Sequence, residues 1–181
     1  MTPSLKPLTS LLRRRGREAQ ADQLYGSIVA QTRLPVFYQR LGVPDTLEGR
    51  FVVLSLHLFA VLHRLKAAGV EAEPLARDMA DRFAADMETV LREIGIGDLA
   101  VPKKVRKLVA SGAALLDEYE EAYGEDEQAL AATIARALPL DAPRATAASG
   151  RLIAYVVGIV RDLEARPLQD LYAGNLQFPE P

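Results

Sequence analysis

The 181-residue sequence contains no cysteine and no tryptophan, and it has only two histidines. The lack of cysteine excludes disulfides, thiolate catalysis and cysteine-ligated zinc, and it suits a reducing compartment. Long hydrophobic runs are missing too. The most apolar stretches, residues 51–62 and 152–160, are shorter than the roughly 18–20 residues that cross a bilayer. No secretory signal is recognisable at the N-terminus, so we expect any membrane contact to be peripheral.

The sequence also lacks a strong charge of either sign. Its net charge of -2 gives the molecule no overall attraction to nucleic acid or to an anionic membrane. The composition, 49% hydrophobic and 25% charged, is that of an ordinary soluble globular protein. A length of 181 residues fits one domain with tails.

Signatures of enzymes are mostly absent. The segment Gly95–Gly97 is too short for a phosphate-binding loop and does not follow a strand. His57 and His63 are six residues apart, so they do not share one helix face as paired metal ligands would. We therefore predict no catalytic residue, no cofactor and no bound metal. The alternative is a helical metal-dependent enzyme that uses His57 with Asp81 or Asp86.

Apolar residues recur at helical spacing along most of the chain, and no segment alternates as a strand does. The fold class we predict is all-α: one domain of about six helices over residues 21–172, with a flexible basic arm at 1–20 and an irregular tail at 173–181. Within the arm a short helix at 8–13 is considered, and the tail has Leu171, Tyr172 and Phe178 as candidate anchors. The expected helices cover residues 19–31, 46–68, 74–94, 102–123, 126–138 and 146–165, with a loop or short helix at 34–42.

The helix from residue 46 has a well-marked start. Pro44 fixes its own φ, Asp45 is placed to cap the first N–H groups, and Glu48 follows three residues later as in a capping box. The helix is apolar on nearly every side, which is typical of a buried helix.

Among the polar residues of this apolar helix, three are spaced seven apart: Arg50, His57 and Arg64. A spacing of seven drifts only about 20° per step, so the three side chains lie along one line. In one interpretation, Arg50 and Arg64 extend to solvent at the two ends while His57 makes one hydrogen bond in the core. In the other, the line is a recognition strip paired with acids of the neighbouring helix, such as Asp81 or Asp86.

The helix that follows Pro102 has its charges reversed relative to the helix dipole. Its first turns are basic and its later turns acidic, which opposes the dipole by roughly 0.3–1 kcal/mol per charge. We predict that the basic turn binds a partner, for which an acidic protein surface, RNA or lipid phosphate would each suit; the alternative is a merely solvated turn. The basic residues are Lys103, Lys104, Arg106 and Lys107, and the acidic ones are Asp117, Glu118, Glu120 and Glu121.

Two blocks of sequence carry a family resemblance. The first is the run from Phe37 to Thr46, continued by Gly49–Phe51 and Leu56–His57. The second comprises Asp81–Phe83, Asp86–Met87, Leu91–Asp98 and Val101–Lys104. In this order, the blocks resemble the ubiquinol–cytochrome c chaperone family over about residues 22–172.

The resemblance implies a helical assembly chaperone rather than an enzyme. Family members hold newly made cytochrome b and promote its assembly into the cytochrome bc1 complex, respiratory complex III. Mitochondrial members work with a small partner protein and can sit near the ribosome exit. This chain resembles the bacterial form, acting from the cytoplasm at the inner membrane. The implied partners are cytochrome b and, further, the ribosome or an anionic membrane surface, with no small-molecule substrate and no specific DNA.

A chaperone for a membrane protein needs an apolar surface rimmed by charge. Phe37, Tyr38 and Leu41 are candidates for it, as is any unpaired side of the helix from residue 46, whereas Phe51 and Leu54 are expected in the core. If a groove exists, the client is expected to lie in it as a helix or extended loop. A competing function is a generic helical protein-binding or nucleic-acid-binding module that uses the basic turn at 103–107.

Overall fold

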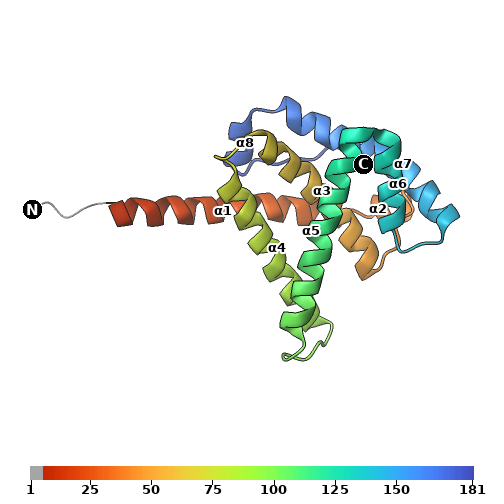
Figure 1. The fold of residues 1–181 in the computed structure, drawn as a ribbon, viewed down its shortest axis with the longest axis horizontal. Coiled ribbons are helices and arrows are strands. Elements are labelled where there is room, and N and C mark those ends of the chain that lie inside the picture. The colour runs from red at the N-terminus through yellow and green to blue at the C-terminus, as the bar shows by residue number, and fades with distance from the viewer. Residues whose placement is uncertain (1–5) are drawn as a thin grey trace, which may run out of the picture.

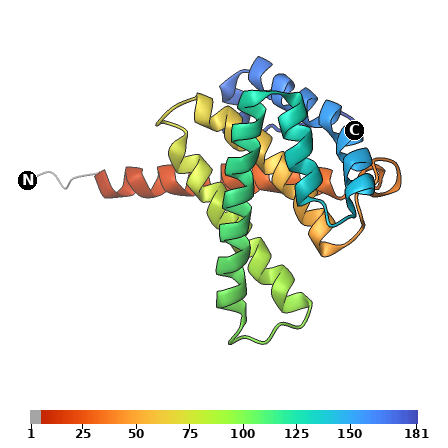
Figure 2. The ribbon, with the colours of Figure 1, turned by 45° about the vertical axis from the view of Figure 1, so that its right-hand side comes forward.

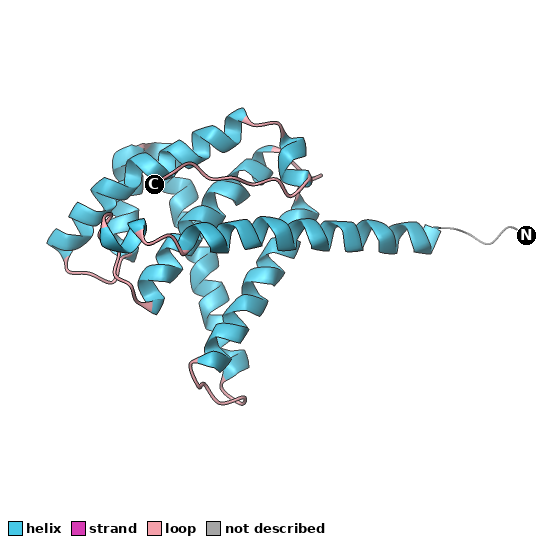
Figure 3. Cartoon of the chain, turned by 180° about the vertical axis from the view of Figure 1, so that it is seen from behind, coloured by secondary structure: helices cyan, strands magenta, loops and turns pink. Residues whose placement is uncertain are grey.

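The computed structural model describes residues 6–181 of the chain, and its side chains from Arg14 onward. Over this range the fold is helical throughout, without a strand (Figure 3). Six long helices and two short ones follow one another: α1 (Lys6–Thr32), α2 (Val36–Gln39), α3 (Leu47–Ala67), α4 (Glu73–Glu93), α5 (Val101–Glu125), α6 (Glu127–Ala137), α7 (Ala142–Ala165) and α8 (Leu168–Tyr172). The predicted all-α fold with six principal helices is confirmed.

The first helix is much longer than the sequence pattern predicts. We expected it from Ala19, but α1 begins at Lys6, and the segment considered as a short helix at 8–13 is part of it. Residues 1–5 of the predicted arm lie outside the described part of the chain. Residues 6–20 show no apolar period, but their Leu, Arg, Ala and Gln residues are strong helix formers. In addition, Arg14 pairs with Glu18 one turn later at 2.8 Å.

The cap of α3 is one residue later than predicted. Thr46, not Asp45, caps the helix: its backbone is extended and its Oγ1 accepts a 3.1 Å hydrogen bond from the Gly49 N–H. Asp45 instead accepts a 2.7 Å hydrogen bond from Nε of Arg50. A Cβ on Gly49 would lie 2.1 Å from the Pro44 carbonyl oxygen, so only glycine allows the entering chain to pack this closely.

Helix α3 lies at the centre of the fold. It contacts α1, α4, α5 and α7, and α6 packs between α5 and α7. Helices α4 and α5 form an antiparallel hairpin that projects from the body, while the N-terminal half of α1 projects in another direction (Figures 1 and 2). Among residues 6–181, no helix combines the length and hydropathy needed to cross a membrane.

The C-terminal segment runs back over the core without regular structure after α8. Leu171 is fully buried, Leu176 is 7% exposed, and Tyr172 and Phe178 pack against the core. Residues 168–172 thus form a short helix where we expected irregular structure, whereas residues 173–181 are irregular, and the predicted anchors do pack on the core.

Candidate functional site

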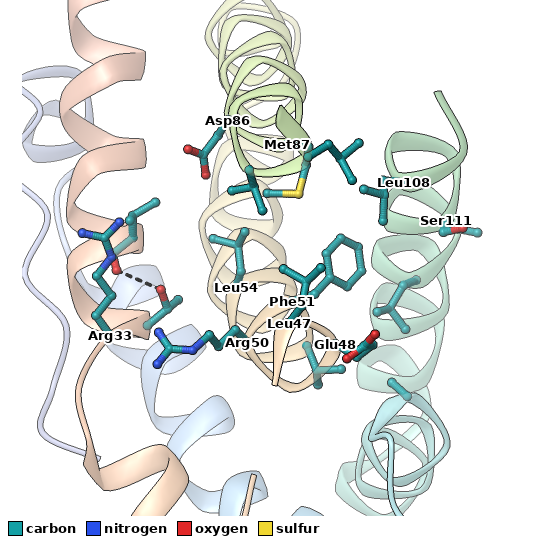
Figure 4. A pocket seen from close by; sticks show the side chains of 18 of the residues that line it. Arg33, Leu47, Glu48, Arg50, Phe51, Leu54, Asp86, Met87, Leu108 and Ser111 are labelled. Atoms are coloured by element: carbon teal, nitrogen blue, oxygen red, sulfur yellow. Dashed lines mark hydrogen bonds between the residues drawn. The ribbon is translucent and has the colours of Figure 1, made fainter. Parts of the chain in front are cut away.

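A hollow with a volume of about 730 Å³ opens between α1, α3, α4 and α5. Its side chains come from all four helices and are mainly apolar (Figure 4). We call it the groove. Its apolar lining consists of Leu47, Phe51, Val52 and Leu54 from α3, Met87, Val90 and Leu91 from α4, Leu108, Ala114 and Leu115 from α5, and Val29 and Ala137.

Charged and polar side chains edge the groove. They are Arg33, Glu48, Arg50, Asp86, Glu118 and Arg136, with Thr32, Tyr38 and Ser111. The guanidinium of Arg50 lies 5.0 Å from the centroid of the Tyr38 ring, a cation–π distance. Arg50 is thereby held beside the opening rather than free in solvent, and an apolar floor with a charged edge results.

Asp86 is fixed at the α1 side of the groove. Its carboxylate accepts a 2.9 Å hydrogen bond from the phenol of Tyr25. Burial, and next the charge of Asp86, raise the pKa of Tyr25, so the phenol stays protonated and donates this bond. The interaction joins α1 to α4 across one wall of the groove.

The groove corrects one expectation about α3. Leu54 is buried in the core as expected, at 7% exposure, and only its edge reaches the groove. Phe51 was expected in the core too, but it is only half-buried and lines the groove, and Leu47 beside it is 44% exposed. The sequence did contain a signal for this open surface. The helix is apolar on nearly every side, and its neighbouring helices do not cover all of those sides.

The two aromatic residues of α2, Phe37 and Tyr38, have different environments. Phe37 was predicted to belong to an apolar surface, but it is fully buried in contact with the rings of His57 and Tyr155. Tyr38 is half-buried, donates a 2.5 Å hydrogen bond to the Thr32 carbonyl oxygen and lines the groove. Only Tyr38 of the pair therefore lies at an open surface.

His57 is a core residue with both ring nitrogens satisfied. Its Nδ1–H donates to the Val53 carbonyl oxygen at 2.7 Å, and its Nε2 accepts from the Tyr155 hydroxyl at 2.8 Å. The ring is 1% exposed, and burial lowers the pKa of His57 to about 4. It therefore makes two hydrogen bonds where we expected one, and it has no exposed surface for a partner.

A chain of hydrogen bonds extends from His57 to the tail. Gln31 donates to the Tyr155 oxygen at 2.9 Å and to the Pro179 carbonyl oxygen at 3.1 Å. Phe178 packs edge-on against the His57 ring at a centroid distance of 4.9 Å. Together these contacts join α1, α3, α7 and the C-terminal segment.

The pairing predicted for Arg50, His57 and Arg64 with Asp81 or Asp86 is wrong. Arg64 donates instead to the carbonyl oxygens of Leu163 and Arg166, at 2.8 and 3.1 Å. These carbonyls lie at the C-terminal end of α7, where helix oxygens lack intrahelical partners and attract cations. Asp81 is exposed on α4, and of Arg50, His57 and Arg64 only Arg50 reaches the groove.

The basic turn lies at the tip of the projecting hairpin. Lys103, Lys104, Arg106 and Lys107 occupy the first two turns of α5, and all four are exposed. Within residues 14–181 none of them takes part in an ion pair, whereas most arginines elsewhere do. The structure leaves these cations available to solvent or a partner.

In the described part of the chain, no group of three or more potential ligands is arranged to hold a metal ion. His57 and His63 lie in separate environments, and His63 Nδ1 contacts a Glu120 carboxylate oxygen at 2.9 Å. The predicted partnership of His57 with Asp81 or Asp86 is not formed.

Comparison with known proteins places this geometry in context. The family model described as ubiquinol-cytochrome C chaperone matches residues 39–178. A solved structure described as the Cbp3 homolog from Brucella abortus is 36% identical and superposes with a TM-score of 0.79, covering 96% of this chain and 97% of that one.

Curated animal proteins are also similar. Ubiquinol-cytochrome-c reductase complex assembly factor 1 of Xenopus laevis is 26% identical over 118 residues, which is 65% of this chain and 59% of that protein. Its counterpart in Mus musculus is 27% identical over 116 residues, 64% of this chain and 39% of that protein. The match therefore spans about two fifths to three fifths of the length of these relatives. On the family match and the structural similarity, the chain belongs to the ubiquinol–cytochrome c chaperone family.

Proposed function

We propose that this protein is an assembly chaperone for the cytochrome bc1 complex, respiratory complex III, and that it holds newly made cytochrome b during assembly. It acts by binding a polypeptide, without catalytic turnover. The proposal agrees with the family and with the names of its relatives. It places the protein in the cytoplasm of a bacterium, at the face of the inner membrane.

The groove is the observation that carries the proposal. A hydrophobic segment of a membrane protein that is not yet inserted must be shielded from water, because apolar surface in water is costly. An open apolar hollow of about 730 Å³ with a charged edge suits such a segment. An amphipathic helix or an extended loop would fit between α4 and α5, with apolar side chains toward Phe51 and Met87.

Site-specific photocrosslinking in cells tests this mode of binding. A photoreactive residue is placed at Leu47 on α3 or at Ser111 on α5, both of which line the groove. We expect both positions to give an adduct with cytochrome b. The matched control is Val70, which is 77% exposed in the connection between α3 and α4 and is not part of the groove lining.

Deletion of the gene gives an independent test of the function. We expect loss of the assembled bc1 complex while cytochrome b is still synthesised. A normal amount of the complex in the deletion strain, together with no adduct from either groove position, would contradict the proposal. If Val70 gave adducts in equal yield, cytochrome b would still be the client, but the groove would not be its binding site.

A further inference from the structure

The tip of the α4–α5 hairpin combines exposed aliphatic side chains with exposed cations. Leu99 is fully exposed and Ile94 is 56% exposed, and they are two of the five large hydrophobic residues exposed in the described structure. Lys103 and Lys104 follow within a few residues, then Arg106 and Lys107. An exposed leucine alone is unremarkable, but apolar and basic groups gathered on one projecting tip form a distinct surface, which we call the hairpin tip (residues 94–107).

The backbone holds this surface in place. Helix α4 ends in a Schellman motif: the Ile96 N–H bonds to the Leu91 carbonyl at 3.0 Å, and the Gly95 N–H bonds to the Arg92 carbonyl at 3.0 Å. Gly95 has the left-handed φ of 84° that this motif requires. At the other end of the turn, Val101 is fully buried. The exposure of Leu99 between these fixed points is therefore a property of the fold.

The charge of the hairpin is strongly polarised along α5. Residues 92–107 carry five basic and two acidic side chains, and one of the acids, Asp98, pairs with Arg92. Residues 108–127 carry seven acidic side chains and no basic one. An anionic surface would attract the tip and repel the end of α5 near the body, so it would orient the molecule with the hairpin pointing toward it.

We propose that the hairpin tip docks on an anionic lipid bilayer, with Leu99 and Ile94 inserted among the acyl chains at the interface and the four cations of α5 against the headgroups. Peripheral membrane proteins gain affinity from this combination of buried apolar area and electrostatic attraction. The contact is through a short turn and does not span the membrane.

The side chains of the tip favour lipid over RNA. Single-stranded nucleic acid is bound by cations together with aromatic side chains on which the bases stack. The tip has no aromatic residue between Phe83 and Tyr119, and its exposed apolar groups are aliphatic. Aliphatic groups gain little against bases or a solvated protein surface, but they gain the hydrophobic effect when they enter a bilayer.

Docking in this way has a geometric consequence for the groove. Leu91, three residues before Ile94, and Leu108, one residue after Lys107, both line the groove. One end of the groove therefore lies next to the tip and would face the membrane. The lipid contact itself does not depend on the proposed client, so the two can fail separately.

Co-sedimentation of the purified full chain with vesicles tests the inference. Vesicles of phosphatidylcholine with one third phosphatidylglycerol are compared with vesicles of phosphatidylcholine alone, at low and at high salt. We expect binding only to the anionic vesicles, and weaker binding at high salt. Each cation contributes about fivefold to such partitioning, so Lys103→Gln with Lys104→Gln is expected to weaken it about 25-fold. Leu99→Asn is expected to weaken it about tenfold.

Matched variants make the test specific. Arg40→Gln with Arg144→Gln removes two exposed cations elsewhere, and Val70→Asn removes another exposed aliphatic side chain; neither change is expected to alter vesicle binding. All substituted positions are on the surface, and unchanged thermal melting verifies the fold. The inference is overturned if the wild-type protein does not bind anionic vesicles, or if the control variants lose as much binding as the tip variants. It is also overturned if the tip binds a single-stranded RNA oligonucleotide but not vesicles. Crosslinking of cytochrome b at Leu47, measured on the tip variants, reports separately on the client.

Discussion

The two halves of one apolar stripe on α3 have different surroundings. In the C-terminal half, Leu58, Val61 and Leu65 are at most 3% exposed and belong to the core. In the N-terminal half, Leu47 is 44% exposed and Phe51 is half-buried, and both line the groove. All five residues recur at helical spacing on one side of the helix. The same sequence pattern therefore contributes to the core at one end and to an open groove at the other.

The difference comes from the neighbouring helices rather than from α3 itself. At the N-terminal half, the walls are formed by Met87 on α4 and by Leu108 and Leu115 on α5, and the space between them is not filled. An apolar side chain contributes to stability in proportion to the surface that folding removes from water. The groove residues keep part of their apolar surface in water, and the proposed client would bury that surface on binding.

The largest expected effect is in the covered half. Leu58→Ala removes a side chain that is 3% exposed and leaves a cavity, so we expect a loss of about 3 kcal/mol in the free energy of unfolding. Urea denaturation followed by circular dichroism measures it. Leu58→Met, which nearly conserves the volume, is the control and is expected to cost less than about 1.5 kcal/mol. A loss below about 1 kcal/mol for the alanine variant would show that this half is not closely packed.

An intermediate effect concerns pH and His57 on the covered side of the helix. Its pKa is about 4 in the folded chain and 6.5 in the absence of burial. Below pH 6.5 His57 is therefore protonated in the unfolded chain but stays neutral in the folded chain. The free energy of unfolding consequently falls as the pH falls toward 4. The expected loss from this group between pH 7 and pH 5 is about 2 kcal/mol.

Urea denaturation at several pH values tests this dependence. In His57→Gln the contribution is absent, so the curve of stability against pH is expected to be flatter between pH 7 and pH 5, although the variant is less stable overall. Identical slopes for the two proteins would mean that the imidazole is not closed off from water as the contacts with Val53 and Tyr155 indicate.

The smallest expected effect on stability is in the open half. Leu47→Ala changes a side chain that is already 44% exposed, so we expect the free energy of unfolding to stay within about 0.5 kcal/mol of the wild type. Co-purification of cytochrome b with the variant is expected to decrease. Undiminished co-purification, or a loss of stability as large as that of Leu58→Ala, would remove the distinction between the two halves.

Apart from the start of α1, the sequence predicted the long helices well, but it did not show which of their faces are covered. Pro74, Pro102 and the apolar periodicity placed α4 and α5 within two residues of their observed ends. The choice between Phe51 as core and Phe51 as groove was not predictable, because periodicity identifies an apolar face without identifying its partner. The cap at Thr46 was missed because Asp45 pairs with Arg50 instead.

Two further examples show where local patterns fail. The spacing of Arg50, His57 and Arg64 correctly predicted that they lie along one line of the helix. Their environments differ: Arg50 is exposed at the groove, His57 is in the core, and Arg64 binds the end of α7. Phe37 was expected at the surface because it lies in a connector, yet α2 carries it into the centre of the fold. The positions of His57, Arg64 and Phe37 depend on tertiary contacts with residues about a hundred positions away in α7.

The contact of the C-terminal segment with the earliest helices affects how the protein forms during translation. Gln31 bonds to Pro179, 148 positions later, and Phe178 covers the ring of a residue in α3. Because a ribosome adds about 5–20 residues per second, Gln31 is synthesised roughly 7–30 s before its partner at Pro179. During that interval the His57 imidazole lacks the cover of Phe178, and this part of the core closes only after residues 178 and 179 have left the exit tunnel.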